Sequence, residues 1–154
     1  VYNLNFQTER SLKIKIEVDT NPPLSFATEQ RLMVQPYSFM VQCMTLPCLF
    51  AGKMHALVYR QWKNRVKGRD WYDFEWYVRW GHPLNWSHLH ERIVEFSGKE
   101  CTKAEFVELL NHRLATTDIN QVKADVLPYV HNPHELDIWS NDYFVQLAQR
   151  IRWE

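Results

Sequence analysis

Residues 46–80, LPCLFAGKMHALVYRQWKNRVKGRDWYDFEWYVRW, decide how this chain folds. Over the first half, apolar residues recur at the three- and four-residue spacing that is typical of an amphipathic helix. The second half, 70–80, has helical spacing too, and it is closed by Gly81 and then Pro83. Between them, residues 60–69 carry five basic side chains and no acid. The stretch therefore predicts two helices joined by a basic turn.

Upstream of this stretch, apolar and polar residues alternate, as they do in strands with one buried face. The predicted strands are 1–7, 12–18, a short strand near 32–34, and 37–44. The first two would pair as a hairpin, which the Asn-Pro-Pro sequence at 21–23 ends. The N-terminal third of the chain is therefore expected to be a small sheet.

Downstream, the spacing of apolar residues is helical again. The predicted helices are 84–96, 102–114, 118–130 and 141–153. Thr102 and Glu105 have the T-x-x-E spacing of a capping box, which marks a helix start. We therefore expect an α+β fold. A small antiparallel or mixed sheet, residues 1–44, completes a larger core, and an α-helical domain follows at 45–154.

The composition limits the classes of function. The chain has 154 residues, enough for one domain or two small lobes, and its 18 basic and 18 acidic residues cancel, so any contact with nucleic acid must be local. The three cysteines, Cys43, Cys48 and Cys101, form no C-x-x-C pair, which favours free thiols in a reducing cytoplasm. No apolar run approaches the roughly 20 residues that span a bilayer, so no membrane partner is expected.

The beginning of the chain is unusual because residues 1–6 already alternate as a strand does, without an initiator methionine. We expect the chain to be the C-terminal part of a longer protein, truncated or cleaved, whose sheet it helps to complete.

Lys53 is the first candidate functional residue. It interrupts an apolar stripe formed by Leu49, Phe50 and Met54. A lysine in that place either extends its ammonium to the surface, which is the commoner outcome, or directs it into a cleft where it can meet phosphate oxygens.

Two acids in the second helix raise a similar question. Asp70 lies on the side of Phe74 and Tyr77, where an apolar residue would be expected, although an acid in a first turn commonly satisfies free N–H groups. Asp73, one turn on, is ordinarily a solvated partner of nearby basic residues. Neither acid alone indicates catalysis.

Glu17 lies on the polar face of the predicted strand 12–18. Such a residue is usually solvated or paired across strands, but a carboxylate on a strand can also complete a Mg²⁺ site for phosphoryl transfer. The basic turn offers a patch suited to a phosphate backbone, although solvation is its commoner fate. Its members are Arg60, Lys63, Arg65, Lys67 and Arg69.

Three segments together resemble the AbiEii/AbiGii abortive-infection toxins, which are nucleotidyltransferases of the polymerase-β-like superfamily. They are L-K-I-K-I-E-V-D-T-N-P-P at 12–23, L-F-A-G-K-M-H-A-L at 49–57 and K-G-R-D-W-Y-D-F at 67–74. The resemblance covers residues 1–80 well and the helical tail loosely. The lysine helix followed by R-D-x-Y-D is its most specific part.

The resemblance implies roles for particular residues. Lys53 matches the helix lysine near the phosphates, Asp70 the acid of the R-D motif in the active cleft, and Asp73 a weaker catalytic candidate. Glu17 matches the strand acid that completes the metal site. Arg60 and Arg69 are expected to bind nucleotide phosphates. Lys63, Arg65 and Lys67 are expected to contact nucleic acid.

The implied reaction transfers a nucleoside monophosphate from a nucleoside triphosphate to an acceptor, such as a tRNA 3′ end or a protein, with Mg²⁺ and with an antitoxin as partner. The family's GS motif with its D-x-D acidic pair, which holds the Mg²⁺ ions and the triphosphate, is absent from this chain. We therefore expect the chain alone to be inactive.

Two alternatives remain open at this stage. The chain could be a non-catalytic module that binds nucleic acid through residues 60–69, or an antitoxin through its aromatic helical tail. It could also be a structural helical tail with an appended hairpin, its charges merely solvated. If Lys53 and Asp70 converge on a cleft beside Glu17, the enzyme is favoured; if they point to opposite surfaces, the structural tail is.

Overall fold

The structure is a computed structural model that describes residues 14–61 and 66–154. Within these two ranges, two strands come first, and six α-helices and two short 3-10 helices follow. They are β1 (Thr28–Met33), β2 (Phe39–Met44), α1 (Leu46–Tyr59), α2 (Arg69–Arg79), α3 (Trp86–Ser97), α4 (Lys103–Thr116), α5 (Ile119–Val126), η1 (Leu127–Tyr129), η2 (Pro133–Leu136) and α6 (Asn141–Ala148). The predicted α+β class is confirmed.

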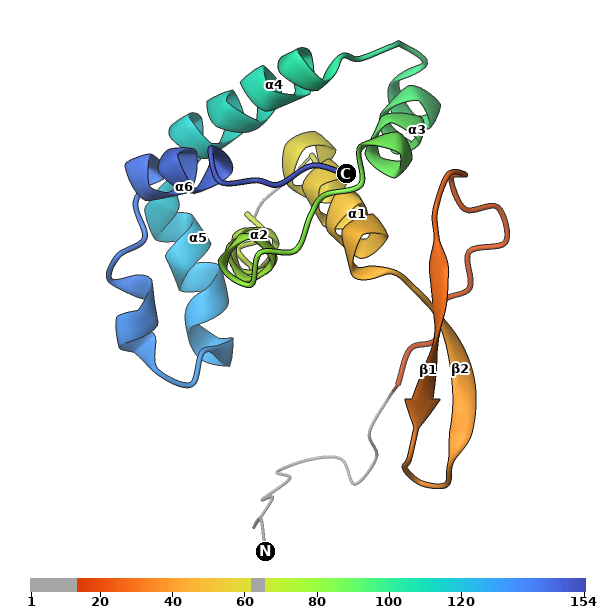
Figure 1. Cartoon of the computed structure of the whole chain (residues 1–154). Coiled ribbons are helices and arrows are strands. Elements are labelled where there is room, and N and C mark those ends of the chain that lie inside the picture. The colour runs from red at the N-terminus through yellow and green to blue at the C-terminus, as the bar shows by residue number, and fades with distance from the viewer. Residues whose placement is uncertain (1–13, 62–65) are drawn as a thin grey trace, which may run out of the picture.

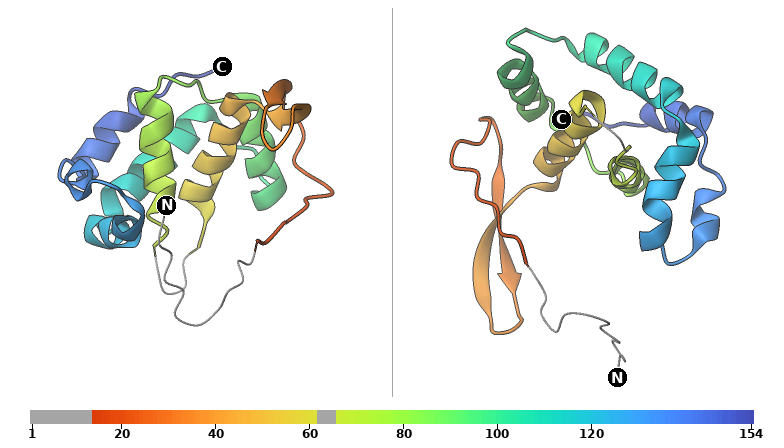
Figure 2. Two further views of the ribbon diagram at one scale, coloured as in Figure 1. Left: turned by 90° about the horizontal axis from the view of Figure 1, so that it is seen from below. Right: turned by 180° about the vertical axis from the view of Figure 1, so that it is seen from behind.

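β1 and β2 form an antiparallel two-stranded ribbon in which Thr28 lies opposite Met44 and Met33 opposite Phe39. The ribbon stands to one side of the helices, and its last residues lead directly into α1 (Figure 1). The view from behind shows the same separation (Figure 2). Several of its apolar side chains are exposed, including Leu32 and Met40. The hydrophobic core therefore belongs to the helices.

α1 is the central helix of that core. It packs against α2, α3 and α4, and its Phe50, Met54 and Leu57 side chains are fully buried. Phe50 stacks in parallel on Tyr77 of α2, with ring centroids 4.6 Å apart. This contact fixes the face that α1 presents to α2, and the candidate residues lie along the same junction.

The helix predictions are confirmed in number and order, with shifted ends. α4 begins with the predicted capping box, because Thr102 Oγ1 accepts a hydrogen bond from the Glu105 N–H and Glu105 accepts one from the Thr102 N–H. The helix predicted at 118–130 is α-helical only to Val126, and the segment that contains Pro128 continues as the 3-10 helix η1.

The predicted helix 141–153 is too long. α6 ends at Ala148, and the chain then extends so that Trp153 forms a bridge with Leu84. The Leu84 N–H donates to the Arg152 carbonyl at 2.7 Å, and the Glu154 N–H donates to the Leu84 carbonyl. These bonds tie the end of the chain to the start of α3.

The hairpin predicted from strands 1–7 and 12–18 is wrong in the part that the structure describes, residues 14–18. Residues 14–18 form no strand, because no other described segment pairs with them, while the rest of that hairpin, 1–13, lies outside the described residues. β1 instead begins at Thr28, earlier than the expected short strand. The change from sheet to helix between 44 and 46 is as predicted, and whether 1–44 and 45–154 are separate domains stays a prediction.

Two further expectations concern the chain as a whole. Cys43, Cys48 and Cys101 are free thiols, as predicted. Among the described residues, no helix is both long and apolar enough to cross a bilayer.

Candidate active site

Lys53 reaches from α1 to α2. Its Nζ lies 2.7 Å from Asp73 Oδ2, and the two side chains are 43% and 30% exposed. Of the apolar stripe, Phe50 and Met54 are fully buried but Leu49 is 41% exposed, and the Lys53 ammonium emerges at the junction of the two helices. The sequence left open whether the Lys53 ammonium lies at the surface or in a cleft. In the structure it lies at the edge of the α1–α2 junction, where it is paired with Asp73 and still reaches solvent.

Asp70 is the buried member of the group. Only 1% of it is exposed, and both of its carboxylate oxygens accept from Arg60 Nη1, at 3.1 and 2.8 Å. Asp70 lies in the first turn of α2, and Arg60 is the residue that follows α1. The negative Asp70 therefore lies at the positive end of the α2 dipole, and the positive Arg60 lies at the negative end of the α1 dipole. Both placements are favourable. Through these bonds to Arg60, Asp70 fixes the two helices to each other.

Arg113 of α4 supports this junction from behind. Its Nε donates to the Leu57 carbonyl at 3.1 Å, and its Nη2 donates to the Arg60 carbonyl. These are carbonyls at the C-terminal end of α1, which α1 itself leaves without partners. Sequence reasoning missed Arg113. Its position beside Leu110 and Leu114 on the buried face of α4 was the available signal, the same one that singled out Lys53.

The electrostatics of the group centre on Asp70. Burial raises the pKa of the Asp70 carboxyl, and the charges of Arg60, Arg69 and Lys53 oppose this rise, while Asp73 adds to it. The structure therefore brings five of the predicted residues, Lys53, Arg60, Arg69, Asp70 and Asp73, into one charged cluster. We call it the Lys53 cluster.

Glu17 does not join that cluster. Its carboxylate pairs with Lys15, two residues away, and its side chain is 75% exposed. Residues 14–18 form no strand, so the mid-strand position that made Glu17 a metal candidate is absent. Within 14–61 and 66–154, His, Cys, Asp and Glu side chains nowhere gather in a group of three or more that could hold a metal ion. The described residues therefore do not fit a Mg²⁺ site by themselves.

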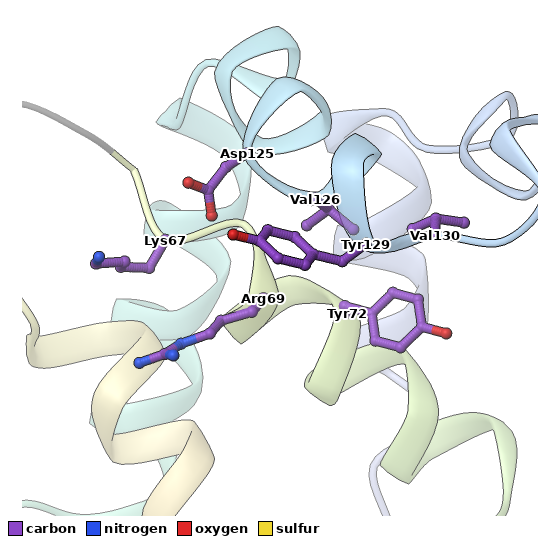
Figure 3. A pocket seen from close by; sticks show the side chains of 7 residues that line it. All are labelled: Lys67, Arg69, Tyr72, Asp125, Val126, Tyr129 and Val130. Carbon is purple, nitrogen blue, oxygen red and sulfur yellow. The ribbon is translucent and has the colours of Figure 1, made fainter. Parts of the chain in front are cut away.

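The basic turn is only partly described. Lys63 and Arg65 lie outside the described residues, so their predicted contact with nucleic acid stays a prediction. Lys67 and Arg69 line a pocket of about 360 Å³ between the start of α2 and the α5–η1 segment, as Figure 3 shows. Tyr72 and Tyr129 are also part of its wall. Sequence reasoning gave no role to either tyrosine.

Gly68 brings the turn and α5 into contact. Its N–H donates to Asp125 Oδ2 at 2.9 Å, and a Cβ added to it would lie 2.2 Å from the Val122 carbonyl oxygen and 2.6 Å from Val126 Cγ2. Only a residue without a side chain fits this approach. The K-G-R-D sequence thus sets both the pocket and the start of α2.

Comparison with known proteins gives one match. No curated protein and no solved structure matches the chain. The family described as nucleotidyl transferase AbiEii toxin, type IV toxin–antitoxin system, matches residues 2–147, which include the whole Lys53 cluster and most of the helical tail. The match agrees with the resemblance carried by the lysine helix and the R-D-x-Y-D motif. Because it covers most of the chain, the chain belongs to the AbiEii nucleotidyl transferase toxin family.

Proposed function

We propose that this protein takes part in transfer of a nucleoside monophosphate from a nucleoside triphosphate to an RNA acceptor, such as a tRNA, and that the Lys53 cluster contributes to its active site. The observation that carries the proposal is the Lys53–Asp73 pair, a solvent-accessible ion pair at the junction of two helices in a chain of this family. A lysine that only extends its ammonium into water has no need of a carboxylate partner on a second helix, and Asp73 of α2 provides one.

Lys53 is the residue suited to meet phosphate. During nucleotidyl transfer, negative charge grows on the leaving pyrophosphate, and a fixed cation stabilises it. Because Lys53 is 43% exposed, a phosphate oxygen can replace the Asp73 carboxylate as its partner without moving either helix. Asp73 then holds the lysine in place before the nucleotide arrives. Arg69, exposed beside the pair, is a second cation for the same phosphates.

Asp70 and Arg60 act as positioning residues in this proposal. Asp70 is buried and fully engaged with Arg60, so its carboxylate reaches neither solvent nor substrate. Its part is to fix the start of α2, and with it Asp73, against α1. This differs from the catalytic role that the resemblance implied for Asp70.

The proposed reaction requires Mg²⁺, but Glu17 is exposed and paired with Lys15, apart from the Lys53 cluster, so we do not assign it as a ligand. Since the described residues do not assemble a complete site, we route no step of the reaction through the metal. The sequence contains no G-S segment followed by a D-x-D pair, so we expect the 154-residue chain alone not to turn over. The free thiols are consistent with a cytoplasmic setting, and the toxin–antitoxin family suggests an antitoxin partner.

The alternative function is a non-catalytic module that binds nucleic acid or the antitoxin. What favours it is that every carboxylate of the Lys53 cluster is already paired with a cation. The two proposals differ in what Lys53 does, because a binding module does not need a lysine that exchanges Asp73 for phosphate.

The test is an assay of the full-length gene product with each nucleoside triphosphate, total tRNA and Mg²⁺. We expect Lys53→Ala to lower label incorporation at least about 100-fold, since positioned charge contributes on that scale. Lys99→Ala, an exposed lysine after α3, is the control. Full activity in Lys53→Ala would refute the role of Lys53, and absence of activity in the wild type would favour the binding module. Turnover by the 154-residue chain alone would contradict the expected inactivity.

A further inference from the structure

The pocket between α2 and η1 lies beside the Lys53 cluster and shares Arg69 with it, while its other lining residues have no part in the proposed chemistry. Two cations, Lys67 and Arg69, and two aromatic side chains, Tyr72 and Tyr129, line it (Figure 3). Tyr129 is 82% exposed, so its ring contributes little to the core. We call this feature the Tyr129 pocket.

The cations of the pocket are available. Among the described residues, neither Lys67 nor Arg69 forms an ion pair, in contrast to Lys53 and Arg60. Among the described residues that line the pocket, the one acid is Asp125, and one of its oxygens already accepts from the Gly68 N–H. The chain as a whole carries no net charge, so this is a local concentration of positive charge.

The tyrosines of the pocket wall could bind the base of a nucleotide, as the cations could bind its phosphate. An exposed tyrosine ring held beside a pocket offers a face on which a base can stack, and stacking tolerates any base. Figure 3 shows the Tyr129 ring lying between Val126 and Arg69, with its hydroxyl directed toward the side on which Lys67 and Asp125 lie. A volume of about 360 Å³ is within the range of small-ligand sites. Ring and cations together match one nucleotide unit, a flat base joined to a phosphate.

We propose that the Tyr129 pocket binds an unpaired nucleotide of an RNA strand, with the base against Tyr129 and the phosphate beside Lys67 and Arg69. Arg69 connects the pocket to the Lys53 cluster, because its charge acts on Asp70. A strand held here would be guided toward the proposed transfer site. That the bound RNA strand is the acceptor of the reaction rests on the proposed function. That the pocket binds an RNA strand does not rest on it, so either statement can fail without the other.

The experiment measures binding alone, without Mg²⁺ or triphosphate. The chain is titrated against a fluorescein-labelled single-stranded RNA 12-mer, and fluorescence anisotropy gives the Kd at several salt concentrations. We expect Tyr129→Ala to raise the Kd about 5- to 150-fold, the range that stacking of one base supplies. Tyr129→Trp should retain binding. Tyr37→Ala, an exposed tyrosine of the ribbon, is the matched control and should bind as the wild type does.

The contact between Lys67 and a phosphate is tested by the salt dependence of the Kd. Lys67→Gln should lower the slope of log Kd against log salt by about 0.7, as loss of one phosphate contact on a single strand does, whereas Tyr129→Ala should leave the slope unchanged. Lys99→Gln is the control. Equal binding by Tyr129→Ala and Tyr37→Ala, or no RNA binding at low salt, would overturn the proposal.

A competition arm separates the two sources of a nucleotide. Unlabelled RNA 12-mer should displace the probe at concentrations near its Kd, while free nucleoside triphosphate should need concentrations far above that. If free triphosphate competes as well as RNA, and Tyr129→Ala abolishes this competition, the pocket holds a free nucleotide and the strand proposal is wrong. If Lys53→Ala loses activity but binds RNA as the wild type does, the result supports both the role of Lys53 in transfer and the role of the Tyr129 pocket in RNA binding.

Discussion

Arg60 and Asp70 join the end of one helix to the start of the next through a single guanidinium nitrogen that donates to both carboxylate oxygens. The aspartate is 1% exposed, and the arginine side chain is 34% exposed. The pair therefore lies at the boundary between core and solvent. Because the carboxylate cannot find water in place of Arg60, the contact matters more to the fold than an ordinary surface ion pair.

The first prediction follows from that burial. Asp70→Ala should lower the free energy of unfolding by about 2–4 kcal/mol, somewhat below the loss for a fully buried pair because Arg60 is partly exposed. Urea unfolding followed by circular dichroism measures it. Asp142→Ala removes an exposed acid at the same position of α6 and should cost less than about 1 kcal/mol. Equal losses in the two variants would contradict the structural role of Asp70.

Lys53 should behave in the opposite way. Its ion pair with Asp73 is partly exposed on both sides, so Lys53→Ala should lower the free energy of unfolding by less than about 1 kcal/mol. The same variant is expected to lose activity in the full-length protein. A loss of stability as large as that of Asp70→Ala would show that Lys53 serves the fold, and would weaken its assignment to phosphate.

The glycine of the K-G-R-D sequence yields a third prediction. Gly68→Ala forces a methyl group to within 2.2 Å of the Val122 carbonyl oxygen, so backbone must move, and we expect a loss of at least about 2 kcal/mol. Gly52→Ala is the control, since its Cβ would meet only Arg92 at 3.9 Å within a helix, where alanine stabilises by up to about 1 kcal/mol. Thermal unfolding of both variants decides the matter. Similar melting temperatures would contradict the close approach of α5.

The sequence predicts those helix boundaries that depend on neighbouring residues, and it does not predict those that depend on contacts between distant parts of the chain. α1 and α2 follow from spacing, and the start of α4 follows from Thr102 and Glu105, because these signals lie within one or two turns. The early end of α6 could not be foreseen, because it depends on Trp153 bridging to Leu84 across the fold. The apolar pattern continues through residues that in fact form an extended tail.

The candidate site shows the same division. Spacing marked Lys53 and Asp70 as charges among apolar residues, but it could not choose their partners, since the two ion pairs form only when α1 and α2 pack together. Glu17 was assigned from an alternating pattern, which creates a strand only where another strand pairs with it, and none does among the described residues. The pocket at Tyr129 depends on packing of α5 against the turn, so it left no local signal.

Glu75 gives a fourth prediction, on the face of α2 that meets the C-terminal part of the chain. Its carboxylate accepts from Trp139 Nε1 at 3.0 Å and from the Tyr143 hydroxyl at 2.5 Å. Burial, followed by the contact with Glu75, raises the pKa of Tyr143, so the hydroxyl stays a donor. Glu75→Gln places an amide where two donors converge, and we expect a loss of about 1–3 kcal/mol.

The control for Glu75 is Glu108→Gln, an exposed glutamate of α4. Urea unfolding gives the free energies, and near-ultraviolet circular dichroism should show a change in the Trp139 environment for Glu75→Gln alone. If both variants unfold at the same urea concentration, the Glu75 contacts do not hold α2 against α6.

The last prediction concerns pH. Burial, assisted by Arg92, lowers the pKa of His55 from 6.5 to about 4, and burial lowers the pKa of His88 as well. The folded state then binds fewer protons than the unfolded state below pH 6.5, so stability is complete above that value and is lost as the pH falls toward 4. His55→Phe keeps the aromatic contacts with Tyr59 and Phe96 but removes this titration. Urea midpoints at pH 7 and pH 5 should therefore differ less in His55→Phe than in the wild type, whereas His131→Phe, at an exposed position, should keep the wild-type difference. An undiminished difference in His55→Phe would mean that the buried imidazole is not what destabilises the fold in acid.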